Sequence, residues 1–160
     1  MWFKRPPRPD IHARDPARRQ AAVDPGQAGQ SALRRLVTRD PDARVRNAAI
    51  RRLRDLIVLR QVIETESDET VRETARVRYR HLLSGGDTLD IGYRRAALAV
   101  CPDRQSVAHG GRSAREPSLR IAALARIREP GLLDEVRCHD PNESVRACAG
   151  ERLRQLAAEG

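Results

Sequence analysis

Residues 40–53 read Asp-Pro-Asp-Ala-Arg-Val-Arg-Asn-Ala-Ala-Ile-Arg-Arg-Leu, and residues 140–149 repeat the pattern as Asp-Pro-Asn-Glu-Ser-Val-Arg-Ala-Cys-Ala. The Val-Arg pair at the centre of both stretches recurs along the chain when its first residue is allowed to vary. The pairs are Arg18-Arg19, Val45-Arg46, Val71-Arg72, Tyr93-Arg94, Leu119-Arg120 and Val145-Arg146. Their spacing of about 26 residues, with one shorter interval, predicts a chain built from internal repeats.

Two further columns keep the same spacing, although the alignment rests on the Val-Arg pair alone. Each pair is followed by an alanine: Ala22, Ala49, Ala75, Ala97, Ala123 and Ala149. Each is preceded by a side-chain acceptor: Asp15, Asp42, Asp68, Asp90, Glu116 and Asn142. An acceptor in this place is typical of a helix N-cap. The first residue of the pair, the alanine and a later Leu, Tyr or Ile fall on one helical stripe, which predicts a buried face.

Shorter apolar segments lie between these capped helices and predict partner helices. Residues 31–38, 55–64 and 131–138 each follow a cap or turn signal. Residues 101–109 are a weaker segment, for which we expect one or two turns. The run Ser84-Gly85-Gly86-Asp87 predicts a truncated partner helix and an irregular turn.

The sequence therefore predicts an all-α fold, a short right-handed α-solenoid of about five to six repeats. Residues 1–12 are expected to form an N-terminal arm, and residues 13–160 a single repeat domain. Arg18 stands where an apolar residue belongs, which leaves the first unit as either a full repeat or a polar terminal cap.

Residues 40–53 and 140–149 resemble the second helix of HEAT repeats, and the resemblance covers roughly residues 13 to 157. In that family an Asp before the second helix and an Arg inside it form a ladder between repeats. The arginine could bond its own cap or the acceptor of the next repeat. The implied ladder residues are Asp42, Arg46, Asp68, Arg72, Asp90, Arg94, Glu116, Arg120, Asn142 and Arg146. The short period leaves a leucine-rich-repeat variant, with helices alternating with short 3₁₀ segments, as the alternative fold.

The first residues carry a looser resemblance. Met-Trp-Phe-Lys-Arg, Arg-Pro-Asp-Ile-His and Asp-Pro-Ala-Arg-Arg-Gln-Ala-Ala are similar to the opening of bacterial proteins that carry "domain of unknown function 349". Those proteins begin with short HEAT-like units before a long helical region. This resemblance implies that the chain could be a structural or regulatory segment of a longer helical protein, with Trp2-Phe3 as a docking element or a cap on the first unit.

The amino-acid composition limits the classes of function that this chain can have. The net charge is +9 and only 2% of residues are aromatic, with Lys4 the single lysine. A basic chain makes binding to nucleic acid more probable, but many of the arginines fall in columns with structural roles. No apolar run is long enough to span a membrane, and the start lacks the apolar segment of a secretory signal. Three cysteines without a paired motif favour a reducing compartment, so we expect a cytoplasmic protein.

No constellation in the sequence indicates catalysis, a metal or a cofactor. The histidines, His12, His81, His109 and His139, and the cysteines, Cys101, Cys138 and Cys148, do not converge at metal-ligand spacing. Gly110-Gly111-Arg112-Ser113 lacks the Gly-Lys-Ser/Thr of a phosphate-binding loop and is expected to be a loop between repeats. The sequence therefore predicts a protein that is not an enzyme.

The remaining function is binding. The capped helices are expected to present an Arg-rich concave surface to an acidic segment of another protein, or alternatively to nucleic acid without sequence preference. The expected surface residues are Arg44, Asn47, Arg51, Arg54, Glu73, Arg80, Arg95, Arg128, Glu151 and Arg154. No feature of the sequence predicts the identity of the partner or the oligomeric state.

Overall fold

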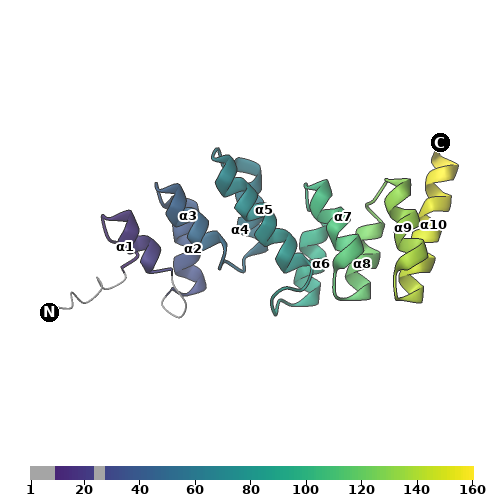
Figure 1. The fold of residues 1–160 in the computed structure, drawn as a ribbon, viewed down its shortest axis with the longest axis horizontal. Helices are drawn as coiled ribbons and strands as arrows, with labels where there is room; N and C mark the ends of the chain where they lie inside the picture. The colour runs from purple at the N-terminus through teal and green to yellow at the C-terminus, as the bar shows by residue number, and fades with distance from the viewer. Residues whose placement is uncertain (1–9, 24–27) are drawn as a thin grey trace. The chain divides into compact units, whose positions relative to one another are not determined.

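The structure is a computed structural model that describes residues 10–23 and 28–160, and every regular element in these ranges is an α-helix (Figure 1). The prediction of an all-α chain is therefore confirmed for the described residues. Most of the predicted N-terminal arm, residues 1–9 with Trp2 and Phe3, lies outside them.

The described helices are of two kinds. The capped helices contain the Val-Arg column and are α1 (Pro16–Ala21), α3 (Ala43–Ile50), α5 (Glu69–Leu83), α6 (Ile91–Ala99), α8 (Pro117–Leu124) and α10 (Glu143–Glu159). The partner helices lie between them and are α2 (Gln30–Arg39), α4 (Leu56–Thr65), α7 (Arg104–Ser113) and α9 (Pro130–His139).

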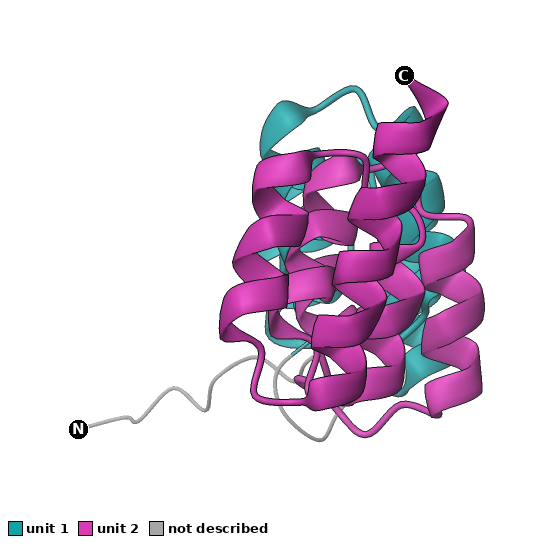
Figure 2. Cartoon of the chain, turned by 90° about the vertical axis from the view of Figure 1, so that its right-hand side faces the viewer, with its two compact units in different colours: residues 1–78 teal, residues 79–160 magenta. Residues whose placement is uncertain are grey.

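The chain divides into two compact units, residues 1–78 (unit 1) and residues 79–160 (unit 2), and the division falls inside α5 (Figure 2). The sequence predicted one repeat domain over residues 13–160. In unit 1, α3 packs against both α1 and α2. In unit 2, α8 packs against α6, α7 and α10, and α9 packs against α10. Each unit thus has its own layer of adjacent helices.

The two halves of the chain follow the same helix plan. The helices α2, α3 and α4 have 10, 8 and 10 residues, and α7, α8 and α9 also have 10, 8 and 10. Both series end in a longer helix, α5 with 15 residues and α10 with 17. Arg52 and Arg78 match Arg126 and Arg152 at one constant interval. This larger repeat was missed because alignment on the Val-Arg pair compares single capped helices only.

Most of the capped helices have a side-chain oxygen that accepts a hydrogen bond from a backbone N–H of the first turn. Asp42 accepts a hydrogen bond at 2.8 Å from a backbone N–H in the first turn of α3, and Asn142 accepts one at 3.2 Å in α10. Asp15 and Asp90 cap α1 and α6 in the same way. Each bond satisfies one of the amides that a helix start leaves without an intrahelical partner. Glu116, before α8, makes no cap bond.

The stripe predicted to be buried forms the core beneath the capped helices. In unit 1, the stripe residues with no exposed surface are Val45, Ala49 and Leu53. In unit 2, the matching residues with at most 2% of their surface exposed are Leu119, Ala123 and Ile127. In α6 the buried apolar residue is Leu98, next to the half-buried Ala97, so the apolar side of this helix faces the core one position later.

Three partner helices, α2, α4 and α9, lie where the apolar segments predicted them. The fourth, α7, differs from the expectation, because it has ten residues instead of one or two turns. Gly110 and Gly111 are not a loop but the buried face of α7, where a Cβ on Gly111 would lie 3.7 Å from the Ala123 Cβ. Because the glycines have no side chains, α7 can approach α8 closely. The mainly polar sequence of this segment did not indicate such a contact.

The run from Ser84 to Asp87 forms the expected irregular turn between α5 and α6. Gly85 has a φ of 95°, a left-handed conformation that favours glycine. The amide of Arg115 donates to the carbonyl of Ser84 at 3.0 Å, and a Cβ on Gly85 would lie 3.1 Å from Arg94 Nη1. The turn is therefore held within unit 2 by a residue that precedes α8.

Replacing Gly85 with alanine is expected to lower the free energy of unfolding by about 1–2 kcal/mol, because an L side chain is strained at this φ. Urea unfolding followed by circular dichroism measures the change. The matched control is Gly131→Ala in α9, where a Cβ would meet nothing within 4 Å and where alanine favours the helix. Equal stability of the two variants would contradict the expectation.

Candidate interaction surface

Arginines of the capped helices reach forward to a carboxylate that precedes the next capped helix. In unit 1, Arg19 Nε lies 2.6 Å from Asp40 Oδ2, and Arg46 Nε lies 3.0 Å from Glu66 Oε2. Asp40 precedes α3 and Glu66 precedes α5. Each ion pair therefore joins two consecutive capped helices.

The same arrangement recurs in unit 2. Arg94 Nη2 lies 2.7 Å from Glu116 Oε1, and Arg120 Nε lies 2.8 Å from Asp140 Oδ2. The side chains of Arg120 and Asp140 are 9% and 4% exposed, so this pair is almost fully buried. The arginine ladder hereafter means the four pairs Arg19–Asp40, Arg46–Glu66, Arg94–Glu116 and Arg120–Asp140.

Three of the ladder arginines also bind the backbone of the loop that leads into their own helix. Arg46 Nη1 donates to the carbonyl of Asp40 at 3.0 Å, and Arg120 Nη1 donates to the carbonyl of Ala114 at 2.7 Å. Arg19 Nη1 makes the matching bonds in the loop before α1. A guanidinium has five N–H donors in one rigid plane, so one edge binds the loop while another binds the carboxylate.

The ladder acceptors differ from the expected ones. Asp42 and Asn142 were expected to be ladder residues, but both accept hydrogen bonds from first-turn amides of the helices they precede. The arginines bind the acidic residue two positions earlier, Asp40 or Asp140. The cap residue is already committed to the helix start, so the earlier carboxylate is the one available to the preceding helix.

Glu116 is the one cap residue that takes part in the ladder. Ala114 occupies the position from which Asp40 and Asp140 bind, and its side chain has no acceptor. The longer side chain of Glu116 reaches Arg94 and does not cap α8. The hydrogen bonds from Arg94 lower the pKa of Glu116 below its usual range.

Arg72 and Arg146, in the last capped helix of each half, bind no carboxylate of a later helix among the described residues. Arg72 pairs with Glu69 of its own helix, and Arg146 donates at 2.8 Å to a backbone carbonyl of the loop before α10. Asp68 and Asp90, two of the expected acceptors, accept from first-turn amides of α5 and α6. The ladder therefore spans three capped helices in each half of the chain.

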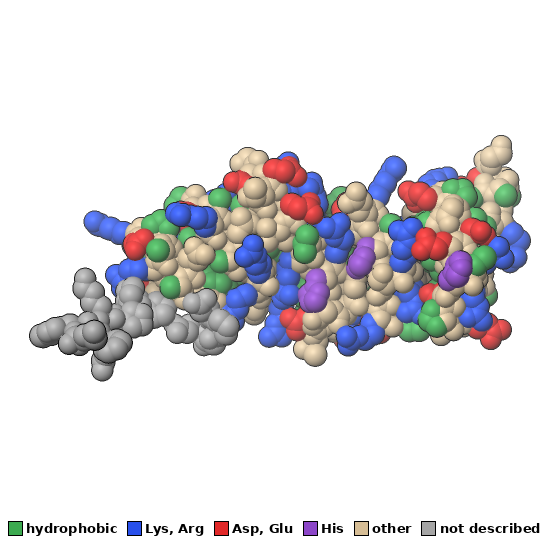
Figure 3. Space-filling model, viewed as in Figure 1, with side chains coloured by type: hydrophobic (Ala, Val, Ile, Leu, Met, Phe, Trp, Pro, Cys, Tyr) green, Lys and Arg blue, Asp and Glu red, His purple; other side chains and the backbone are tan. Residues whose placement is uncertain are grey.

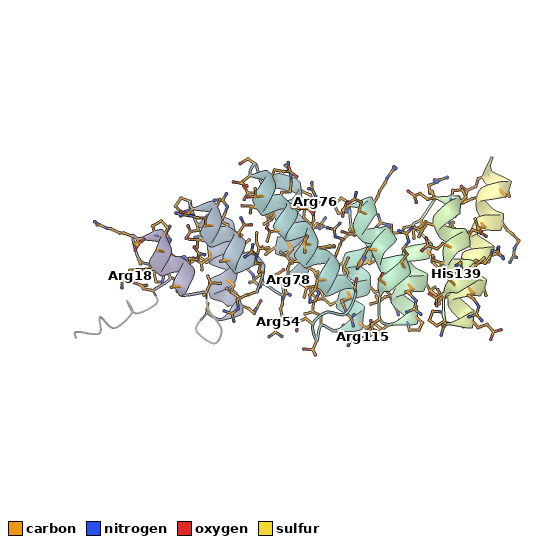
Figure 4. All side chains as sticks on the ribbon, viewed as in Figure 1. Arg18, Arg54, Arg76, Arg78, Arg115 and His139 are labelled. Carbon is orange, nitrogen blue, oxygen red and sulfur yellow. The ribbon has the colours of Figure 1, made fainter. Side chains whose placement is uncertain are left out.

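A second group of arginines binds backward to the end of the preceding capped helix. In unit 1, Arg78 Nε donates to the carbonyl of Leu53 at 2.9 Å (Figure 4). In unit 2, Arg126 Nη2 donates to the carbonyl of Cys101 at 2.8 Å, and Arg152 Nε donates to the carbonyl of Ile127 at 3.3 Å. A cation at this end of a helix is favoured by the free carbonyls and by the helix dipole.

The ladder and the backward bonds leave a smaller set of arginines for other roles. Of the expected surface residues in unit 1, Arg44 is exposed but pairs with Asp42 at 2.9 Å, which lowers the pKa of Asp42 to about 2. Asn47 is half-buried. Glu73 is exposed and pairs with Arg76 at 3.2 Å.

Arg54 is exposed in the segment after α3, where its backbone N–H donates to Gln30 Oε1 (Figure 4). Arg51, at the end of α3, is exposed, and its side chain makes no ion pair with any described residue. Arg44, Asn47 and Arg51 share one side of the α3 segment by their helical spacing. Arg51 is therefore the unneutralised charge of this group.

In unit 2, the expected surface residues are also divided by their ion pairs. Arg80 is half-buried and donates to Gln105 Oε1 at 3.4 Å. Glu151 and Arg154 are exposed and neutralise each other at 2.5 Å. Arg95, on α6, is exposed and has no ion pair among the described residues.

Arg128, the last expected surface residue, follows α8 and its side chain is 72% exposed. Its Nη2 lies 2.7 Å from Oε2 of Glu159 near the end of α10. Acidic side chains also lie among the basic ones on the face shown in Figure 3, so the charge there is mixed. Of the expected surface residues, Arg51 and Arg95 are exposed charges without an ion pair among the described residues.

Other exposed arginines lie outside the capped helices and were missed because the expected surface included capped helices only. Arg35 and Arg39 on α2, Arg104 at the start of α7 and Arg115 before α8 are exposed and form no ion pair within the described ranges. Figure 4 places Arg115 in the segment between α7 and α8. The available signal was the lack of a carboxylate three or four residues from Arg35 in the sequence.

The groups that could carry chemistry are dispersed. Across residues 10–23 and 28–160, no three His, Cys, Asp or Glu side chains are grouped so that they could hold a metal ion. Burial raises the pKa of the Cys101 thiol, which disfavours the reactive thiolate. His139 is exposed and contacts the carbonyl of Glu135 on its own helix (Figure 4).

No helix in the described part of the chain combines the length and the apolar character that crossing a membrane requires.

Comparisons with known proteins add no relative, because no protein-family model, no curated protein and no solved structure matches the chain.

Replacing Arg120 with methionine is expected to lower the free energy of unfolding by about 3–5 kcal/mol, because Asp140 then remains as a buried charge without its partner. Arg137→Met is the matched control, because Arg137 forms an exposed pair with Asp134 of the same helix and its loss should change stability far less. Urea unfolding compares the two. Similar costs would show that the ladder pair does not hold the helices together.

The lowered pKa of Glu116 predicts a dependence of stability on pH. A carboxyl with a lower pKa in the folded state than in the unfolded state stabilises the fold above its unfolded pKa of about 4.3, and this contribution disappears as the pH falls through the folded pKa. Glu116→Gln should therefore be less stable than the natural chain at neutral pH and approach it on acidification. Exposed Glu143→Gln should differ little at either pH. Urea unfolding from neutral to about pH 3 tests this, and a constant difference for Glu116→Gln would contradict it.

Proposed function

We propose that the helix pairs form a short right-handed α-solenoid of HEAT-like repeats. The recurring arginine, alanine and cap columns support this architecture, as do the bonds that join successive capped helices within each unit. In such proteins each repeat packs only on its neighbours, which suits a chain whose apolar residues are mainly Ala, Leu, Val and Ile. The alternating long helices of the described ranges favour this fold over the leucine-rich alternative.

We further propose that the chain is a non-catalytic scaffold whose capped helices present a concave, basic surface to an acidic segment of another protein in the cytoplasm. The observation that carries this proposal is the exposure of Arg51 and Arg95, which have no carboxylate partner among the described residues. Exposed guanidinium groups can form two hydrogen bonds to one carboxylate of a partner and can steer its approach.

Nucleic acid is the second candidate, supported by the net charge of +9. It would bind through phosphate contacts, with affinity that falls steeply as salt rises. Single-strand binding generally adds aromatic side chains on which bases stack, and only 2% of this chain is aromatic. The acidic protein segment is therefore the better-supported partner.

The test is a pull-down from a bacterial lysate, with and without nuclease, using the natural chain and the double variant Arg51→Glu/Arg95→Glu. We expect a protein that remains after nuclease treatment and is lost with the variant, because each substitution replaces an attractive charge with a repulsive one. The matched control is Arg35→Glu/Arg39→Glu, which makes the same change of charge on exposed residues of a partner helix.

Equal loss of the protein with both double variants would show that only net charge matters and would overturn the assignment to the capped helices. Recovery of nucleic acid alone, lost at higher salt, would replace the protein partner with the second candidate.

A further inference from the structure

Unit 2 contains a cavity of about 230 Å³ beside the segment that joins α6 to α7 and the segment that joins α8 to α9. Its walls combine buried apolar side chains with exposed guanidinium groups. The residues that matter here are Cys101, Val107, Ile127, Arg104, Arg126 and Arg128. Cys101, Val107 and Ile127 are at most 5% exposed and form the apolar part of the wall.

The three arginines of the cavity differ in what already binds them. Arg126 is fixed by its hydrogen bonds to the carbonyls of Leu98 and Cys101. Arg104 is exposed and forms no hydrogen bond or ion pair through its side chain with any described residue. Arg128 extends to Glu159. The cavity therefore has one fixed cation, one uncommitted cation and one cation that already binds a carboxylate.

The matching place in unit 1 is bridged by a side chain. Gln30, the first residue of α2, donates through Nε2 to the carbonyl of Arg52 at 3.2 Å and accepts from the amide of Arg54 at 2.8 Å. At the constant interval between the two halves, Gln30 corresponds to Arg104, the first residue of α7. The first residue of the partner helix is thus a bridging amide in α2 and an uncommitted arginine in α7.

A carboxylate of the chain itself shows what the rim of this cavity binds. Glu159 Oε2 lies 2.7 Å from Arg128 Nη2, and Glu159 Oε1 lies 3.6 Å from Arg152 Nη1. Among the described residues, Glu129 is the one acidic side chain in the wall, against the three arginines. Its Oε2 accepts from the backbone N–H of Arg128, and Glu129 forms no ion pair with any of the three guanidinium groups.

We propose that this cavity binds the carboxylate side chain of an acidic segment of the partner protein, between Arg104 and Arg128. This inference rests on the proposed function and names the anchor point of the partner. Val100, 57% exposed in the segment before α7, offers an apolar contact for a neighbouring residue of that segment. The preferred segment therefore carries an acidic residue close to an apolar one. Glu159 occupies part of the rim and competes with the partner.

The experiment measures fluorescence anisotropy of a fluorescein-labelled peptide of Glu and Leu residues, and of the same peptide with Gln at every Glu, added to the full chain. Arg104→Gln removes the uncommitted cation and installs the residue found at the matching position of unit 1, so we expect binding of the Glu peptide to weaken about tenfold. Arg35→Gln removes the same charge from α2, and because Arg35 does not line the cavity it should leave binding within about twofold.

Glu159→Gln releases Arg128 and should strengthen binding by about two- to fivefold, the range expected for an exposed ion pair. Circular dichroism confirms that each variant is folded. The proposal is overturned if Arg104→Gln and Arg35→Gln weaken binding equally, if Glu159→Gln does not strengthen it, or if the Gln peptide binds as well as the Glu peptide.

The two proposals can fail separately. A protein captured from the lysate and lost with Arg51→Glu/Arg95→Glu, but captured normally by Arg104→Gln, would preserve the scaffold and remove the cavity as its anchor. If the protein is lost with Arg104→Gln but is captured normally by Arg51→Glu/Arg95→Glu, the cavity remains the binding site and the exposed surface of the capped helices does not.

Discussion

The guanidinium of each ladder arginine is the contact on which the packing within each unit depends. At Arg120, the side chain bonds the loop before its own helix and the carboxylate that precedes the next capped helix, so it joins segments far apart in the sequence. A buried charge is costly unless its partners satisfy it. Because Asp140 and the carbonyls are both in place, one side chain sets the spacing and orientation of two successive helices. Lysine, with a single compact ammonium group, cannot bond in two directions within a plane.

Small side chains allow the helices to come close enough for these bonds to form. Ala49 and Ala123 have no exposed surface, and Gly110 and Gly111 let α7 pack tightly against α8. Tyr79 is the one aromatic side chain buried in the described core, and its hydroxyl donates to the carbonyl of Ala97 at 3.0 Å. Thin layers of Ala, Val and Leu bury little area per residue, so correctly paired polar groups matter more here than in a core rich in aromatic residues.

Periodicity in the sequence predicted the helix starts and the buried stripe, because a cap and a stripe depend on residues within one helix. The acceptors of the ladder could not be predicted in the same way. Asp40 and Asp42 are both acidic and close in sequence, and only the path of the backbone decides that Asp42 caps α3 while Asp40 binds Arg19. The length of α7 was missed because its buried face is made of glycine, serine and one valine. The pairing of Arg128 with Glu159 likewise depends on tertiary structure.

The use of Glu116 in place of an acid at position 114 shows how such a chain can change without losing its fold. Moving the carboxylate by two positions is compensated by a side chain one methylene longer, so the bond to Arg94 is kept on a different backbone site. A lineage could gain the acid at position 116 first and lose the acid at position 114 later. The arginine would then have a carboxylate partner at every stage. The pairs α2–α3 and α7–α8 each carry an acceptor for the preceding capped helix and a donor for the following one, so duplication of such a pair would bring matched ends. Growth by tandem duplication, followed by drift of individual acids, would leave the kind of inexact but equally spaced halves that this chain contains.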